Sequence, residues 1–198
     1  MSLHHLLYIP LLLVNFSGLP PVAKPDPIVI VNTLPVNEKE EDDEYIPWLP
    51  ERRLAWEDFY AEPKRNSEAV ASTSTSLGIS YQLEDGVLVY QVTCNFSKQK
   101  SWGLLKTDYI LAHEQGHFDI TEIAARRLHG ALMQYEFKAD SYKQDINALY
   151  RIIVKDKENM QAEYDHITDH SRNRRLQREW QEKIKMMLEE TKEWALYP

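Results

Sequence analysis

Two histidines and a glutamate in the middle of the chain have the spacing of a metal-binding motif. His113, Glu114 and His117 form the pattern His-Glu-x-x-His inside a stretch with helical periodicity. Residues four apart lie on one face of a helix, so the two imidazoles can reach one point, as a tetrahedral zinc ion requires. Glu114 flanks that point, where it can take a proton from a metal-activated water. The motif predicts Zn²⁺ bound by His113 and His117, with Glu114 as general base.

A pair of hydrogen-bonded core histidines is the alternative interpretation of the motif. The histidines share their helix face with apolar residues, and a capping residue precedes the helix. Buried imidazoles on such a face need polar partners, and a metal ion supplies one. We therefore favour the metal site. The apolar positions are Ile110, Ile120, Ala124 and Leu128, and the capping candidates are Thr107 and Asp108.

Composition limits the classes of function that the chain can serve. The 198 residues, 43% hydrophobic and 27% charged, suit one ordinary globular domain. A net charge of −8 argues against nucleic-acid binding, which needs a basic surface. The single cysteine, Cys94, cannot form an intramolecular disulfide, and its place in a strand pattern suggests a buried, inert thiol.

The N-terminal region reads as a targeting segment followed by a linker. Residues 6–16 form an apolar run that is too short to span a membrane but suits the core of a signal peptide. An N-terminal strand or a disordered tail is the alternative. We expect a signal peptide over residues 1–18, a Pro-rich and acidic linker with one short strand over 19–50, and a metallopeptidase domain over 51–198. The protein would then be secreted or periplasmic, with no stable membrane span in the mature chain.

Around the motif, the periodicity predicts an α+β fold. Alternating apolar residues over 79–96, broken at Asp85-Gly86, predict an antiparallel hairpin with one face on a core. Helices are expected over 107–137, with a bend at Gly130, and over 140–164 and 174–195. A small antiparallel sheet is thus followed by a helical half that carries the motif. The edge of the hairpin could pair with an extended peptide.

Two histidines leave a catalytic zinc site one protein ligand short. Asp119 and Glu122 fall on the wrong side of the helix, and His129 lies three turns further along its axis. A polar segment after the second helix can fold back to the site. Its candidate ligands are Asp165, His166, Asp169 and His170.

The chain resembles a bacterial family of predicted secreted zinc-dependent proteases, catalogued as a domain of unknown function within the zincin group. The most specific shared string is His-Glu-Gln-Gly-His-Phe-Asp-Ile, and the resemblance spans about residues 50–185. The pieces that carry it, in order, are Leu54–Phe59, Ser72–Thr75, Ser101-Trp102, His113–Ile120, Tyr164-Asp165-x-x-Thr168-x-His170 and Gln177-x-x-Trp180.

The resemblance implies a zincin-like metallopeptidase fold and a place near the metal for the segment that begins at Tyr164. We take His170 as the third zinc ligand, with Asp165 as the alternative, and Tyr164 as a hydrogen-bond donor to the developing oxyanion. Asp165, Asp119 or Asp169 would orient a ligating imidazole. The chain departs from the family pattern at Ser171, where glycine is usual, in what we expect to be a tight turn.

These expectations define a zinc-dependent hydrolase of a peptide or protein substrate. One alternative is a non-catalytic scaffold or binding protein that keeps the fold, although such a protein has no need of Glu114. Another is a zinc amidase that cleaves a non-peptide amide of the cell wall, because the same site chemistry serves both reactions.

Overall fold

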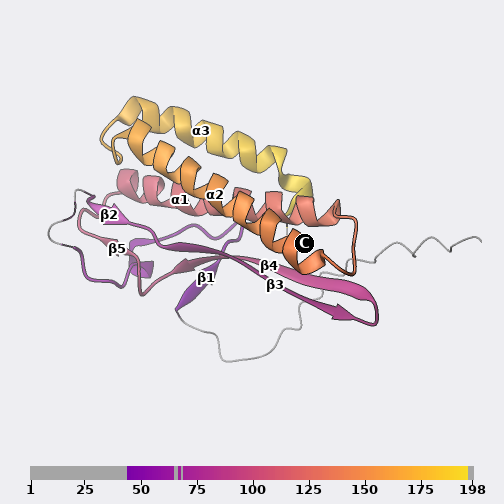
Figure 1. Ribbon diagram of the computed structural model, residues 1–198. Coiled ribbons are helices and arrows are strands. Elements are labelled where there is room, and N and C mark those ends of the chain that lie inside the picture. The colour runs from indigo at the N-terminus through magenta and orange to yellow at the C-terminus, as the bar shows by residue number, and fades with distance from the viewer. Residues whose placement is uncertain (1–43, 65–66, 68, 196–198) are drawn as a thin grey trace, which may run out of the picture.

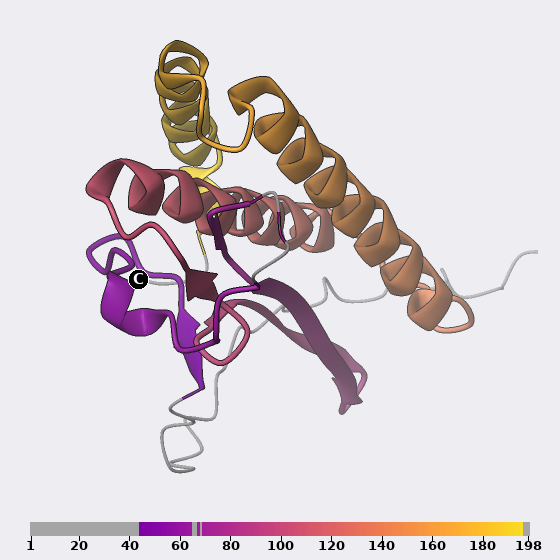
Figure 2. The ribbon, with the colours of Figure 1, turned by 90° about the vertical axis from the view of Figure 1, so that its left-hand side faces the viewer.

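A layer of helices covers one face of a small antiparallel sheet in the computed structural model (Figures 1 and 2). The structure describes residues 44–64, 67 and 69–195. The predicted signal peptide, the strand expected near residue 30 and most of the linker lie outside these residues. Within them, the α+β class with a small sheet and a helical second half is confirmed.

The main sheet has three antiparallel strands in the order β1-β4-β3. They are β1 (Tyr45–Pro47), β3 (Thr75–Glu84) and β4 (Val87–Ser97). The predicted hairpin is confirmed: Asp85 and Gly86 both have positive φ, 49° and 82°, as a two-residue type I′ turn requires. The alternating residues of β4 are buried, namely Leu88, Tyr90, Val92, Cys94 and Phe96.

The folded region begins before the boundary expected at residue 51. Strand β1 pairs with the end of β4, and Ile46 and Trp48 are both buried in the core. A strand of three residues among prolines is too short to show periodicity, so burial of these two side chains was not visible in the sequence.

A second, two-stranded sheet leads directly into the first helix. It pairs β2 (Ala71–Ser72) with β5 (Trp102–Gly103). The 3₁₀ helix η1 (Trp56–Asp58) packs beside it, because Gly103 leaves room for the Trp56 ring, which would lie 2.5 Å from a Cβ at that position. In Figure 1, β2 lies at the same end of the molecule as the start of α1 and the α2–α3 connection.

Three helices make up the second half: α1 (Asp108–Met133), α2 (Tyr142–Thr168) and α3 (Arg174–Glu190), followed by the 3₁₀ helix η2 (Lys192–Trp194). Thr107 caps α1 as expected, accepting a hydrogen bond from Ile110 N. Gly130 was expected to bend or interrupt this helix, and the interruption is wrong, since α1 continues through Gly130. This glycine instead makes room for the Trp194 ring, 2.6 Å from where a Cβ would be.

Helix α2 extends four residues beyond the end expected at Tyr164. Buried Thr168 continues it and donates its hydroxyl hydrogen to Tyr164 O at 2.7 Å. The polar segment expected to follow the second helix therefore begins as part of that helix, which fixes the direction of its first side chains. The helix ends at Thr168, and its C-cap Asp169 is the first of three consecutive residues with positive φ.

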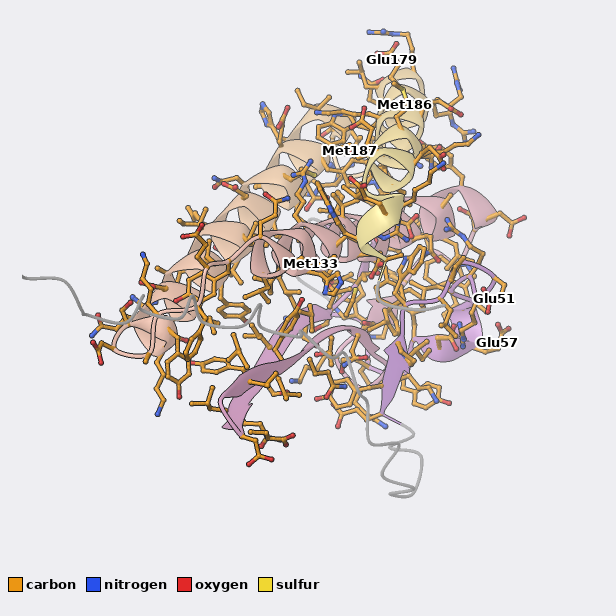
Figure 3. The ribbon with its side chains drawn as sticks, turned by 90° about the vertical axis from the view of Figure 1, so that its right-hand side faces the viewer. Glu51, Glu57, Met133, Glu179, Met186 and Met187 are labelled. Carbon is orange, nitrogen blue, oxygen red and sulfur yellow. The ribbon has the colours of Figure 1, made fainter. Side chains whose placement is uncertain are left out.

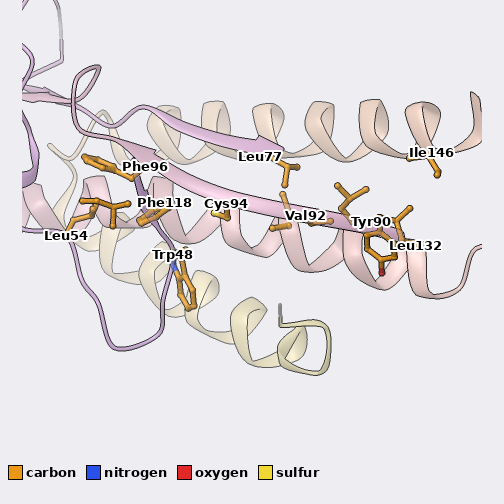
Figure 4. Packing of buried hydrophobic residues seen from close by; sticks show 14 of the residues in the cluster. Trp48, Leu54, Leu77, Tyr90, Val92, Cys94, Phe96, Phe118, Leu132 and Ile146 are labelled. Carbon is orange, nitrogen blue, oxygen red and sulfur yellow. The ribbon is translucent and has the colours of Figure 1, made fainter. Parts of the chain in front are cut away.

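Two apolar clusters hold the layers together. Figure 4 shows the first, in which Leu77, Phe96 and other residues of the sheet pack against Phe118 and Leu132 of α1. The second lies among the three helices and includes Met187 of α3, whereas the neighbouring Met186 is 62% exposed (Figure 3). Helix α1 is thus buried on most sides between the sheet and the other helices, a rigid setting for the motif. None of the helices in the described part of the chain is long and apolar enough to cross a membrane.

Candidate metal centre

The two motif histidines and Asp165 bring three ligand atoms together. The Nε2 atoms of His113 and His117 each lie 3.1 Å from Oδ1 of Asp165. All three atoms lie within 4.8 Å of one another. The imidazoles come from successive turns of α1, with ring planes at 86°, and the carboxylate comes from the last turns of α2. The structure therefore joins two helices at one candidate site.

The spacing of these atoms suits a tetrahedral ion. Ligand atoms about 2.1 Å from zinc are about 3.4 Å apart in tetrahedral geometry, close to the 3.1 Å separations here. Two imidazoles and a carboxylate also form one of the ligand sets that catalytic zinc uses. The residues present fit a zinc ion with one open position.

Tyr164 supports the imidazoles from beneath. Its ring stacks on His113 at 4.5 Å and meets His117 edge-on at 5.2 Å. The buried Nδ1 of His113 has no hydrogen-bond partner among the described residues, so stacking on Tyr164 and the bond of Nε2 to Asp165 orient that ring. Tyr164 itself is fully buried, and its hydroxyl points to His113 O at 3.4 Å.

Glu114 lies beside the same site with one carboxylate oxygen unused. The residue is 4% exposed, and its buried Oε2 has no hydrogen-bond partner among the described residues. A buried, unpaired carboxylate oxygen is costly unless something in the adjoining space hydrogen-bonds to it. Because Glu114 borders the cavity next to His113 and His117, a water or substrate group there can supply that bond.

A cavity of about 200 Å³ connects these groups. One side is formed by residues 69–73, which include β2, and the other by α1, α2 and the turn after α2. The sequence did not predict residues 69–73 and Gln161 as part of this cavity, and the edge expected to pair with an extended peptide was that of the 79–96 hairpin. No hairpin residue is among those that line the cavity in the described chain. Its lining is Ala69, Val70, Ala71, Ser72, Thr73, His113, Glu114, His117, Gln161, Asp165, His170 and Ser171.

The strand and Gln161 gave little signal in the sequence. Residues 69–73 are small and carry no ionisable group, so only their position makes them part of the site. Gln161 lies one turn before Asp165 on α2 and donates to Thr121 Oγ1 at 3.0 Å and to His117 O at 3.4 Å. A helix extended through Thr168 would have placed Gln161 and Asp165 on one face.

The imidazoles stabilise the negative charge of Asp165, and Asp165 stabilises a positive charge on His117. Burial alone raises the pKa of Asp165, but hydrogen bonds from His113 and His117 outweigh it and hold that pKa well below its usual range. Burial likewise lowers the pKa of His117, yet the hydrogen bond and charge of Asp165 outweigh burial and raise it overall. A cation that replaces the imidazole protons would meet a carboxylate already in its charged form.

The other predicted site residues lie at varying distances from this centre. His170 borders the cavity, with Nδ1 3.6 Å from Asp165 Oδ1, but lies outside the group of three converging ligand atoms. Asp169 is exposed and pairs with Arg172. Asp119 does not orient an imidazole. It accepts hydrogen bonds from Trp48 and Gln115, because it lies on a different side of α1.

These features define an α+β protein with a candidate metal site between two helices. Residues 49–171 match a family described as bacterial protein of unknown function (DUF922). The match covers more than half of the chain, including β2 to β5, α1 and all of α2, and the chain belongs to this family. No curated protein and no solved structure matches it.

Proposed function

We propose that this protein is a zinc-dependent peptidase with a zincin-like fold. The observation that carries the proposal is the convergence of His113, His117 and Asp165 beside Glu114, whose Oε2 is buried without a partner. A structural metal site needs no such carboxylate, whereas metal-assisted hydrolysis needs a base at this place. We assign His113, His117 and Asp165 as the ligands, in place of the set with His170.

A zinc ion bound there would polarise the scissile carbonyl and lower the pKa of a water toward about 7. The chain's own residues would do the rest. Glu114 would accept a proton from the attacking water and pass it to the leaving nitrogen. Tyr164, stacked on His113, would keep the imidazoles in place.

The strand beside the cavity supports a peptide as the substrate. Leu104 N donates to Val70 O at 2.8 Å, so Val70 and Leu104 form a hydrogen-bonded pair. Hydrogen-bonded and non-hydrogen-bonded pairs alternate in an antiparallel ladder, and Ala71 comes next, opposite Gly103. The N–H and C=O of Ala71 therefore point away from β5, and Ala71 borders the cavity. An extended peptide could pair with this edge of β2.

The test combines metal analysis with cleavage assays on wild type and Glu114→Gln. We expect stoichiometric zinc in both proteins, with cleavage of a peptide library by wild type only. Cleavage of a peptidoglycan digest but not of peptides would replace the proposal by a cell-wall amidase. Bound zinc without any hydrolysis would leave a scaffold, and absence of zinc after addition of excess metal would contradict the metal site.

We also propose that the protein acts outside the cytoplasm, in the periplasm or the medium. This proposal rests on the apolar run of residues 6–16, which lies outside the described part of the chain. N-terminal sequencing of protein from the cell envelope fraction tests it: an N-terminus near residue 19 is expected, and an intact Met1 in the cytosol contradicts it.

A further inference from the structure

Besides a metal ion and a base, a hydrogen-bond donor would further stabilise the oxygen on which negative charge develops during peptide hydrolysis. Tyr164 was the expected donor, but its hydroxyl is buried toward His113 O and its side chain does not border the cavity. Gln161 borders the cavity, yet its amide hydrogens already go to Thr121 and His117 O. The hydroxyl of Thr73 has no hydrogen-bond partner among the described residues, but its oxygen is buried. We therefore look for the donor at a more exposed residue that faces the same space.

His170 occupies a suitable position. It borders the same cavity as Ala71 of β2, and its side chain is 40% exposed, so a substrate can reach it. Its Nδ1 lies 3.6 Å from Asp165 Oδ1, beyond hydrogen-bonding distance. The ring makes no hydrogen bond to any described residue, so an N–H of the imidazole can face a substrate next to the proposed zinc ligands.

The backbone holds His170 in an unusual conformation. Asp169, His170 and Ser171 have φ values of 50°, 48° and 72°, three consecutive non-glycine residues in the left-handed region. The turn is closed by hydrogen bonds from His170 N to Asp165 O at 2.9 Å and from Asn173 N to Thr168 O at 2.8 Å. Strain of this kind persists where the surroundings fix it, and it concentrates at functional sites.

We propose that His170 is a catalytic residue that donates a hydrogen bond to the carbonyl oxygen of the scissile peptide bond. This inference rests on the proposed peptidase function and deepens it. The water oxygen forms a bond to the carbonyl carbon, and the π electrons move to the carbonyl oxygen, where the His170 N–H stabilises them. Glu114 takes the water proton and delivers it to the amide nitrogen as the C–N bond breaks, which yields a carboxylic acid and an amine.

The experiment compares His170→Ala and His170→Gln with two control variants. Asp165→Ala removes a proposed ligand. His166→Ala removes an exposed histidine from the last turn of α2. His166 does not border the cavity, so this variant is the matched control. Each protein is assayed for zinc content, for the absorption spectrum of its cobalt(II)-substituted form, and for kcat and KM on a peptide that wild type cleaves.

We expect His170→Ala to keep stoichiometric zinc and the wild-type cobalt spectrum, with kcat reduced by about 10²- to 10³-fold and KM nearly unchanged. His170→Gln keeps an N–H donor and should recover part of kcat. His166→Ala should match wild type, and Asp165→Ala should lose zinc or change the cobalt spectrum.

Two results would overturn the proposed role of His170 and leave the peptidase proposal standing. Loss of zinc or an altered cobalt spectrum in both His170 variants would make it a ligand, and an unchanged kcat in folded His170→Ala would leave it without a catalytic role. Failure of the wild type to bind zinc or cleave any peptide overturns the peptidase proposal itself, and this inference with it. Circular dichroism shows whether each variant is folded, and His170→Gln decides the outcome if His170→Ala is not.

Discussion

The hydroxyl of Tyr164 lies 2.7 Å from the position that a Cβ would occupy on Gly116, and two ring carbons lie 2.9 Å from it. Gly116 is the last of the three residues between the motif histidines, so the motif itself makes room for the ring that stacks on His113. This relationship couples the sequence between the ligands to the packing beneath them. It explains why a glycine stands in the middle of a long helix despite its poor helix propensity.

Gly116→Ala should destabilise the protein and weaken zinc binding together. Alanine improves helix propensity by about 1 kcal/mol, but a clash with the fully buried Tyr164 costs about 1 to 3 kcal/mol, so the net effect is a loss. A displaced ring no longer orients His113, and zinc affinity should fall about tenfold or more. Urea denaturation and zinc titration against a chelator measure the two effects.

The matched control is Gly130→Ala on the same helix. Its Cβ would lie 2.6 Å from the ring of Trp194, far along α1 from the histidines, so stability should fall while zinc affinity stays at the wild-type value. Equal losses of zinc affinity in both variants would show that general destabilisation, not the Tyr164 contact, governs the site.

Ser171→Gly should stabilise the protein. Ser171 has φ +72°, where a side chain costs about 1 to 2 kcal/mol that glycine avoids. Greater freedom of glycine in the unfolded chain offsets part of this gain, so we expect a net increase of about 1 kcal/mol in the free energy of unfolding. Ser171→Ala keeps the Cβ and should give no gain. A loss of stability in Ser171→Gly would show that the serine side chain contributes more than the strain costs.

The sequence predicted those parts of the site that depend on residues close together in the chain. His113, Glu114 and His117 are placed by one helix, whose local periodicity fixes their relative positions. The choice between Asp165 and His170 depended on where α2 ends. Polar composition around Tyr164 favours a loop, but packing of Tyr164 and Thr168 in the core continues the helix, which turns Asp165 toward the imidazoles.

The parts of the fold that were missed depend on long-range pairing. Strand β1 exists because Tyr45, Ile46 and Pro47 pair with the end of β4, about fifty residues away. Strand β2 exists because it pairs with the segment that enters α1. Strand β1 has three residues and β2 has two, which is too short for a repeating hydrophobic pattern to appear in the sequence. Their local sequence therefore did not predict them. The long hairpin, by contrast, repeated its pattern over enough residues to be recognised.

The ion pair of Arg52 with Asp58 should make stability depend on acid pH. Burial raises the pKa of Asp58, but the two hydrogen bonds from Arg52, at 2.7 and 3.0 Å, and one from Ala55 N outweigh it and lower that pKa. A group whose pKa is lower in the folded state stabilises the protein above its unfolded pKa, near 3.8, and loses that contribution as pH falls through the folded value.

Asp58→Asn should therefore be less stable than wild type at pH 7, by about 1 to 2 kcal/mol, and the gap should narrow below about pH 4. Guanidinium denaturation of both proteins between pH 7 and pH 3 measures the difference. A gap that stays constant over this range would mean that Asp58 contributes through its shape and neutral hydrogen bonds rather than through its charge.

Zinc binding should release protons, and more of them in wild type than in Asp165→Asn. The carboxylate of Asp165 raises the pKa of His117 above its usual 6.5, despite the opposing effect of burial, so the metal-free protein retains a proton that zinc must displace. This pair stabilises the metal-free protein below about pH 6.5, and the contribution is lost as pH rises through the folded pKa. Removing the charge of Asp165 lowers the pKa of His117 and leaves fewer protons for zinc to displace.

Calorimetric zinc titrations at pH 6.5 in two buffers of different ionisation enthalpy count the released protons. Equal proton release by the two proteins would show that Asp165 does not control the protonation of His117, although the two side chains lie 3.1 Å apart.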